Sequence, residues 1–464
     1  MPTLKKTMFR EYDLRGRETD DELNETSMYY IGKGFGTFLR KRDIKDIIVG
    51  HDARGTSENF HKSAIKGLLE CGMNITDIGT VTTPMSYWAQ YYFKVKGLLT
   101  VTASHNPAGW NGVKLGSGLS YTLLTDELSE VYDIIAKEEF TDGNGSLRQQ
   151  DIFNPYMDDL ISKASVTKTF KILINTGNGT AGLYFPKILK KTGCEIVEHF
   201  TNVDSTYPNY TPNPDGTAMM EDTGKQTVEN DCDFGFAFDG DGDRLGLVDE
   251  KGDIIWPDRY IILLSRLVLR KHPGAKIVFD VKVSEALPED IKAHGGIPIM
   301  WKTGHSYIKA KLAEEKAAMA GEMSGHIFFV DDFYGFDDAM FAALKILEYL
   351  STQDKPLSQI IASTPYYVST PTIQVKTTDE DKYKVVEKLT KEFKGEGYKV
   401  VDINGARVYF NGGWGLVRAS SNTPTLVLRF EAKTEEELEK IKKVFKAKLD
   451  KFDSVSSDWD STGH

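Results

Sequence analysis

The sequence is poor in cysteine and has no long hydrophobic run. Its 464 residues include only Cys71, Cys194 and Cys232, which are too far apart in sequence to form a CxxC pair. We therefore expect inert, unbridged thiols in a reducing compartment. The longest apolar stretch, near 261–269, is interrupted by a serine and an arginine. It falls far short of the roughly 20 residues that cross a bilayer, and residues 1–10 do not resemble a secretion signal. These absences predict a cytoplasmic protein with no membrane partner.

The sequence also lacks an excess of positive charge. It has a net charge of −11, with 40% hydrophobic and 27% charged residues. This composition excludes disordered and disulfide-stapled classes and argues against a nucleic-acid binder, which usually presents a basic surface. A small anionic substrate stays possible if it meets a locally cationic site.

Short apolar runs alternate with helical patterns along most of the chain. This alternation predicts βαβ units and an α/β protein with parallel or mixed sheets. The runs that we interpret as strands are 44–49, 98–102, 170–174, 234–238, 245–248, 276–280, 297–301 and 426–430.

The strand–helix pattern restarts several times, which predicts several domains. We place the boundaries so that the segments are 1–151, 152–252, 253–365 and 366–464. Near the end, Thr434 and Glu437 have the spacing of a helix-capping box. Apolar residues then mark one face of a predicted helix at Leu438, Ile441, Phe445 and Phe452. Residues 454–464 are polar and are expected to fray.

A polar loop follows the predicted strand 98–102. It contains Ser104, His105 and Asn106, which expose a hydroxyl, an imidazole and an amide at the end of a strand. One interpretation is a catalytic loop, and the other is an ordinary turn stabilised by its own side chains. We do not expect a Ser–His catalytic pair, because adjacency in sequence does not by itself place a base on the hydroxyl.

Three aspartates separated by glycines form the most specific chemical motif. Asp239, Asp241 and Asp243 can converge on one hard cation, and oxygen ligands favour Mg²⁺, Mn²⁺ or Ca²⁺ over Zn²⁺. An EF-hand is excluded because Arg244 occupies the position that requires glycine, and because the flanks resemble strands. The alternative is a glycine-rich hairpin whose aspartates are solvated.

Two later loops carry groups suited to a sugar phosphate. Residues 321–326 offer Glu322, Ser324 and His326, although an ordinary loop is equally compatible with them. Residues 418–424 offer Arg418 followed by small hydrogen-bonding side chains, which can surround a phosphate or simply form a turn. The glycine-rich segment 175–182 lacks both the GxGxxG spacing and a Walker lysine, and we interpret it as a structural turn.

Together these four motifs resemble the α-D-phosphohexomutase superfamily. In order they match its phosphoserine, metal, sugar-binding and phosphate-binding loops, and 9–16 and 50–54 match further signatures. The likeness extends from about residue 8 to 452 and is greatest to bifunctional members that act on mannose and glucose phosphates. The last loop departs from the pattern, with Ser-Ser-Asn-Thr where relatives commonly have Ser-Asn-Thr.

The resemblance implies four domains around a central cleft, three of them similar α/β mixed-sheet domains and the fourth a smaller α+β domain. It implies hexose phosphate substrates, Mg²⁺, glucose 1,6-bisphosphate as activator, and a monomer or weak homodimer. It assigns catalytic roles to Ser104, Arg15, Lys114, His305 and His326. It assigns Mg²⁺ binding to Ser104, Asp239, Asp241 and Asp243. It assigns substrate binding to Arg244, Lys282, Glu322, Ser324, Arg418, Ser420, Ser421 and Asn422.

Other functions remain open at this level. A phosphoglucosamine mutase would share every motif, although Met323 resembles the dual-specificity form of the sugar loop. A metal-dependent phosphatase would use the aspartates but would have no reason for a distant phosphate loop. A sugar-phosphate binding protein would need neither the serine nor the aspartates.

Overall fold

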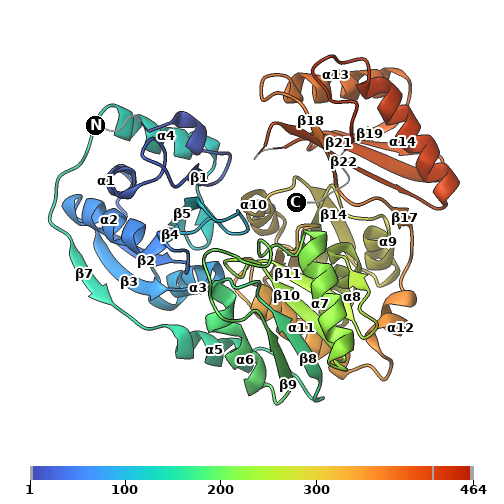
Figure 1. Cartoon of the computed structure of the whole chain (residues 1–464), viewed down its shortest axis with the longest axis horizontal. Coiled ribbons are helices and arrows are strands. Elements are labelled where there is room, and N and C mark those ends of the chain that lie inside the picture. Colours follow the sequence, from blue (N-terminus) through green and yellow to red (C-terminus); the bar gives the residue numbers. More distant parts are fainter. Residues whose placement is uncertain (1–3, 421–422, 460–464) are drawn as a thin grey trace. The chain divides into compact units, whose positions relative to one another are not determined.

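The computed structural model describes residues 4–420 and 423–459, which fall into two compact units (Figure 1). Unit 1 comprises Met1–Pro214, Ala218–Ile255 and Gly325–Leu357. Unit 2 comprises Asp215–Thr217, Trp256–Ser324 and Ser358–His464. Among the described residues, no helix is both long enough and apolar enough to cross a membrane.

The first sheet of unit 1 has the strand order β1-β5-β4-β2-β3-β7, with β6 paired to β5. Its central strands are parallel, and the β1–β5–β4 edge is antiparallel, so the sheet is mixed. Ile47 and Val49 face a large core that also contains Phe35 of the first long helix, which lies beside the sheet (Figure 1, blue). The elements are η1 (Lys6–Met8), β1 (Leu14–Arg17), α1 (Glu25–Arg40), β2 (Asp46–His51), α2 (Ser57–Glu70), β3 (Asn74–Thr80), α3 (Thr83–Phe93), β4 (Gly97–Val101), β5 (Trp110–Gly118), β6 (Tyr121–Thr122), α4 (Thr125–Ala136) and β7 (Ser146–Gln149).

The second sheet of unit 1 has the order β12-β11-β10-β8-β9 and is also mixed. Strands β8, β9 and β10 are parallel, whereas β10 and β11 form an antiparallel hairpin. The elements are α5 (Phe153–Ser162), β8 (Lys171–Asn175), η2 (Thr180–Leu183), α6 (Phe185–Lys191), β9 (Glu195–His199), α7 (Thr217–Glu229), β10 (Phe234–Phe238), β11 (Leu245–Asp249) and β12 (Ile254–Ile255). Unit 1 also includes β16 (Ile327–Phe329), which is not a strand of this sheet, and α11 (Ala339–Ser351).

Unit 2 contains a parallel arrangement of three strands, in the order β14-β13-β15. Every residue of β13 after Lys276 is buried, as expected of a strand covered on both faces. The elements are α8 (Pro257–Lys271), β13 (Lys276–Asp280), α9 (Ala286–Ala293), β14 (Ile297–Trp301), α10 (His305–Glu315), β15 (Met319–Gly321) and α12 (Leu357–Ala362).

The last sheet of unit 2 has the order β17-β22-β21-β20-β19, with β18 paired to β22, and its described strand pairs are all antiparallel. One face packs with helices α13 and α14 in a core that includes Val417 and Phe445 (Figure 1, red). The other face presents Trp414 and Leu416, which pack against Val281. The elements are β17 (Val368–Ser369), β18 (Ile373–Lys376), α13 (Lys382–Gly395), β19 (Lys399–Val401), β20 (Ala406–Phe410), β21 (Gly413–Ala419), β22 (Thr425–Ala432) and α14 (Glu435–Leu449).

The strands β10, β13 and β14 have the predicted bounds, and all three cysteines are buried and free, as expected. The predicted C-terminal helix is too long, because α14 ends at Leu449 and a turn brings Phe452 onto the same core. The fraying expected from residue 454 is wrong for the described residues, since the ring of Trp459 stacks on Phe430 at 5.9 Å.

Candidate functional site

The loop after β4 holds Ser104 in the left-handed backbone region, at φ 50°. Its N–H donates to the hydroxyl of Thr102 at 2.9 Å, and the side chain is almost fully buried. A left-handed conformation costs a non-glycine residue of order 1–3 kcal/mol and persists only where the surroundings impose it.

Arg54 imposes this loop conformation. Its guanidinium donates to the carbonyl oxygens of Ser104 at 2.8 Å and Asn106 at 2.6 Å. It also donates to those of Pro107 at 3.0 Å and Trp110 at 3.1 Å. The arginine of the 50–54 signature is therefore the anchor of the serine loop, a role that the sequence analysis did not assign.

The Asp239–Arg244 turn joins β10 to β11 and brings three carboxylates together. Oxygen atoms of Asp239, Asp241 and Asp243 lie within 4.8 Å of one another, and all three side chains are fully buried. A side chain at Gly240 would meet the Ser104 carbonyl oxygen at 2.4 Å, so glycine is required where this turn approaches the serine loop. The predicted convergence of the aspartates is confirmed.

The serine hydroxyl contacts this cluster directly. Ser104 Oγ donates to Asp239 Oδ2 at 3.0 Å, across 135 residues of sequence. It also lies 3.1 Å from His105 Nδ1, so our reason for discounting an imidazole at this hydroxyl was wrong. The left-handed backbone at Ser104 allows two adjacent side chains to meet. Burial, together with Arg244 and Arg15, lowers the pKa of His105 well below its usual range, so this imidazole is neutral.

Lys114 balances part of the negative charge. Its ammonium lies 2.5 Å from Asp243 Oδ2 and 3.2 Å from Asp241 Oδ2, and its side chain is buried. Burial alone would lower the pKa of Lys114, but Asp241 and Asp243 raise it well above its usual value. Lys114 therefore acts as a fixed positive charge at neutral pH.

The three carboxylates differ in their electrostatics. Burial and the charges of Asp243 and Asp241 raise the pKa of Asp239 well above its usual range. Burial also opposes ionisation of Asp243, but Lys114 and His326 outweigh it and lower the pKa of Asp243 well below its usual range. The protein surroundings therefore stabilise a negative charge at Asp243 but disfavour one at Asp239.

The donor set fits a hard divalent cation. Asp241 Oδ2 accepts from the hydroxyls of Thr83 at 2.6 Å and Thr102 at 3.2 Å, whereas its buried Oδ1 has no hydrogen-bond partner. An unpartnered buried carboxylate oxygen within an all-oxygen cluster suits the coordination of Mg²⁺ or Ca²⁺. The residues present therefore fit a metal ion.

Arg15 lies beside the serine loop. Its guanidinium donates to Asn106 Oδ1 at 3.0 Å and to the Ala103 carbonyl oxygen, and pairs with Asp13 at 2.8 Å.

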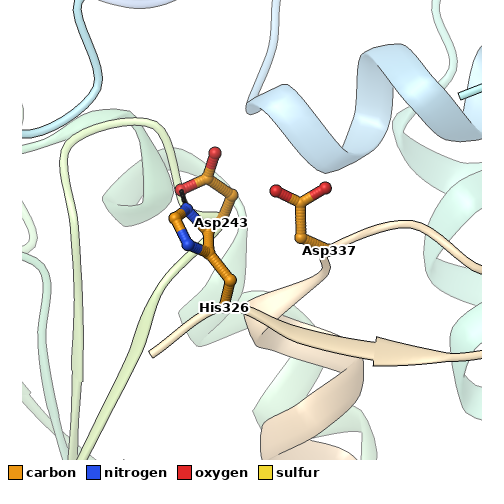
Figure 2. Close-up of side chains that lie close together, drawn as sticks. All are labelled: Asp243, His326 and Asp337. Atoms are coloured by element: carbon orange, nitrogen blue, oxygen red, sulfur yellow. Dashed lines mark ion pairs between the residues drawn. The ribbon is translucent and has the colours of Figure 1, made fainter. Parts of the chain in front are cut away.

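His326 contacts the aspartate cluster. Its Nε2 lies 3.3 Å from Asp243 Oδ1 and 3.3 Å from Arg244 Nε, which places Arg244 in the same cluster. Asp337, which the sequence analysis missed, faces Asp243 and His326 and is fully buried (Figure 2). Residues 321–326 connect β15 to β16, with Glu322 and Ser324 in unit 2 and His326 in unit 1.

Unit 2 contains a separate group of predicted site residues. Glu322 is buried, and its Oε1 accepts the N–H of Gly304 at 2.5 Å. His305 is the first residue of α10, and Lys282 follows β13. Both of their side chains are mostly buried, while Ser324 is half-buried.

The predicted phosphate loop follows β21 in the C-terminal sheet. Arg418 lies on β21, and Ser420 accepts hydrogen bonds from the N–H of Thr423 at 3.2 Å and its hydroxyl at 2.9 Å. Ser421 and Asn422 lie outside the described residues.

Comparison with known proteins identifies the family. Sequence models of phosphoglucomutase/phosphomannomutase match in four parts: alpha/beta/alpha domain I at 6–142, domain II at 154–252, domain III at 256–367 and the C-terminal domain at 373–448.

Relatives match over nearly the whole chain. A phosphomannomutase/phosphoglucomutase of Pseudomonas aeruginosa is 39% identical over 454 residues, covering 98% of this chain and 97% of that protein. A phosphoglucomutase of Neisseria gonorrhoeae is 37% identical over 454 residues, covering 97% of this chain and 98% of that protein. The crystal structure of a phosphoglucomutase/phosphomannomutase family protein from Burkholderia thailandensis superimposes with a TM-score of 0.91 at 36% identity, covering 97% of this chain and 98% of the other. The chain belongs to the phosphoglucomutase/phosphomannomutase family, whose members are metal-dependent.

Proposed function

We propose that this protein is a phosphohexomutase that interconverts the 1-phosphates and 6-phosphates of mannose and glucose. The observation that carries the proposal is the contact of Ser104 Oγ with Asp239 Oδ2 at 3.0 Å, within the buried three-aspartate cluster. A hydroxyl at this place can carry a phosphoryl group and pass it to a sugar. The name of the Pseudomonas aeruginosa relative supports both hexoses as substrates.

The chain's own residues supply orientation and charge. Arg54 fixes the serine loop, so that Ser104 Oγ is held toward the aspartates before substrate arrives. Lys114 and Arg15 offer permanent positive charges to the transferring phosphoryl group. The hydroxyl of Ser104 donates its proton to Asp239, and a neutral His105 can orient the same hydroxyl by donating Nδ1–H to Oγ at 3.1 Å.

Asp239, Asp241 and Asp243 would hold Mg²⁺, with the phosphorylated Ser104 as a further ligand. When bound, the ion neutralises charge on the phosphoryl group and orients it. His326 and Arg244 border this cluster on the Asp243 side, where a phosphate oxygen can meet them.

The sugar and its second phosphate would contact residues of unit 2. We assign sugar hydroxyls to Glu322 and Ser324, and further contacts to Lys282 and His305. The phosphate that is not being transferred would bind at Arg418 and Ser420, together with Ser421 and Asn422. The bisphosphorylated sugar must turn around between two transfers, which requires this second phosphate site. Glucose 1,6-bisphosphate would then act as activator, because it phosphorylates an unmodified Ser104.

Four domains would carry these loops. The matched family ranges support boundaries near residues 151, 252 and 365, with the phosphoserine, metal, sugar and phosphate loops on successive domains.

One incubation distinguishes the candidate activities. The purified protein is mixed with glucose 1-phosphate, Mg²⁺ and a trace of glucose 1,6-bisphosphate, and the products are followed by phosphorus NMR. A mutase gives glucose 6-phosphate, a phosphatase gives free phosphate, and a binding protein gives neither. Ser104→Ala should abolish isomerisation and remove the phosphoserine seen by mass spectrometry. Near-normal turnover by this variant would contradict the assignment.

The same assay tests the alternative substrate. A phosphoglucosamine mutase would turn over glucosamine 6-phosphate faster than either hexose phosphate. We expect the reverse order, because Met323, between Glu322 and Ser324, resembles the form of this loop found in enzymes that act on both mannose and glucose phosphates.

A further inference from the structure

Asp280 is a fully buried carboxylate at the end of β13 to which the function proposed above gives no role. Its Oδ1 accepts the backbone N–H of Met323 at 3.1 Å, and its Oδ2 accepts the hydroxyl of Thr303 at 2.8 Å. The ammonium of Lys282 lies 3.8 Å from Oδ2. One side chain therefore joins two distant segments of unit 2 and also contacts Lys282 of its own segment.

The two distant segments and Lys282 itself carry predicted sugar-phosphate contacts. Met323 lies between Glu322 and Ser324, and Thr303 lies two residues before His305. A second bond ties two of the segments together, because the N–H of Gly304 donates to Glu322 Oε1 at 2.5 Å. Gly304 has φ 125°, a conformation that side-chain-bearing residues rarely adopt.

The segment after β13 is itself held from the other side. Arg407 of β20 donates to the carbonyl oxygens of Val281 at 2.6 Å and Val283 at 2.8 Å. Arg429 of β22 donates to the carbonyl oxygen of Lys282 at 2.5 Å. Both arginines are almost fully buried, so the segment next to Asp280 has a fixed backbone path.

Building on the proposed mutase activity, we propose that Asp280 is a positioning residue for sugar recognition, which holds the Glu322–Ser324 loop and the Thr303–His305 loop in one arrangement. A carboxylate suits this place because it accepts hydrogen bonds on both oxygens and attracts Lys282 as well. An asparagine keeps one acceptor but turns an NH₂ group toward one of the two donors. The two loops would then no longer share a common anchor, although β13 and its neighbours stay paired.

The test compares three variants with the wild-type protein. Asp280→Asn removes the charge and one acceptor, and Thr303→Val removes the hydroxyl donor alone. Asp290→Asn is the matched control. Asp290 is another buried carboxylate of unit 2, and it pairs with Arg266 of α8 at 2.5 Å instead of with the predicted sugar-binding loops. For each protein we would measure kcat and KM with glucose 1-phosphate and mannose 1-phosphate, and the temperature of unfolding.

We expect Asp280→Asn to raise KM and to lower kcat/KM about ten- to a hundredfold for both hexoses, as for the loss of a charged hydrogen bond. Thr303→Val should also raise KM and lower kcat/KM, but by smaller factors. In the double variant, kcat/KM should fall by less than the product of the two single-variant factors. Asp290→Asn should lower the unfolding temperature but change KM less than about twofold. A wild-type KM in Asp280→Asn, an equal KM rise in the control, or independent effects of Asp280 and Thr303 would each overturn the proposal.

A binding measurement separates this proposal from the proposed function. Calorimetric titration with glucose 1-phosphate should show the same order of affinities as KM. If the wild-type protein binds glucose 1-phosphate but does not isomerise it, the mutase assignment fails while the role of Asp280 is still decided by the affinities. If Asp280→Asn binds as tightly as the wild type, the positioning role fails whatever the activity.

Discussion

Replacing Asp239 by asparagine should raise stability in the absence of Mg²⁺ and weaken the stabilisation that Mg²⁺ provides. The carboxylate is fully buried, and burial with Asp243 and Asp241 raises its pKa well above the usual range. Because the folded protein holds the proton of this carboxyl more tightly than the unfolded chain does, Asp239 favours folding below about pH 4. This contribution to the free energy of unfolding is lost as the pH rises through the folded-state pKa. At pH 8 without metal, Asp239 therefore destabilises the folded protein relative to low pH. Asparagine keeps an acceptor for the N–H groups of Asp243 and Arg244 without the charge, so this variant should unfold at a higher temperature.

Mg²⁺ should stabilise the variant less than the wild type. A ligand that binds only the folded protein stabilises it by RT ln(1 + [L]/Kd), which is about 2.7 kcal/mol at a hundredfold excess over Kd. If the loss of one of three carboxylates weakens binding tenfold, about 1.4 kcal/mol of this stabilisation remains at the same Mg²⁺ concentration. The Mg²⁺-induced shift of the unfolding temperature should then be roughly halved.

The assay is calorimetric unfolding at pH 8, in EDTA and at several Mg²⁺ concentrations. Asp249→Asn is the matched control, because Asp249 also has a pKa raised by burial and accepts the N–H groups of Lys251 and Asp253 at 2.9 and 3.0 Å. It lies on β11 outside the cluster and should retain the whole Mg²⁺ shift. The reasoning is refuted if Asp239→Asn unfolds earlier than the wild type in EDTA, or if it retains the full Mg²⁺ shift.

Three further substitutions test the sugar loop and two buried titratable groups. Glu322→Ala should lower kcat/KM for mannose and glucose phosphates alike, by roughly ten- to a hundredfold, and loss of one hexose only would contradict the assigned contact. Burial raises the pKa of Asp338 to about 7 even though Tyr156 donates to it, so stability should fall as the pH rises through 7. Asp338→Asn should therefore gain unfolding temperature relative to the wild type between pH 6 and pH 9, and a difference that does not vary with pH would count against this. Burial and the nearby His61 lower the pKa of His51, so protonation below about pH 6.5 favours the unfolded chain. His51→Gln should move the acid-unfolding midpoint to lower pH, as measured by circular dichroism.

The parts of the site that could be predicted are those that lie close together in sequence. Asp239, Asp241 and Asp243 share one hairpin turn, so their spacing alone predicts convergence. The covered strands β10 and β13 are continuous apolar runs, which define their bounds. The resemblance to a known family supplied the remaining roles, because no spacing links Ser104 to Asp239.

The parts that could not be predicted depend on contacts between distant segments. Arg54 and Asp280 each look like one charged residue among many, and only the folded chain shows that their bonds converge on functional loops. The proximity of His105 to the serine hydroxyl depends on the left-handed backbone of Ser104, which propensity gives no reason to expect. Phe452 kept helical spacing after the helix had ended, because a turn can also place an apolar side chain on the same core.

The hydrogen bonds of Arg407 and Arg429 limit how parts of this protein can be exchanged with relatives. Both guanidinium groups bind backbone carbonyl oxygens, so they recognise the path of the chain and not the side chains at 281–283. The side chains of that segment are restrained by their own contacts instead, Val281 by the cluster with Trp414 and Leu416, and Lys282 by Asp280. A chimaera that takes its C-terminal sheet from a relative must bring an arginine at each of these two positions. Without them, three buried carbonyl groups would lose their donors, and the graft would fold beside the preceding domain without docking on it.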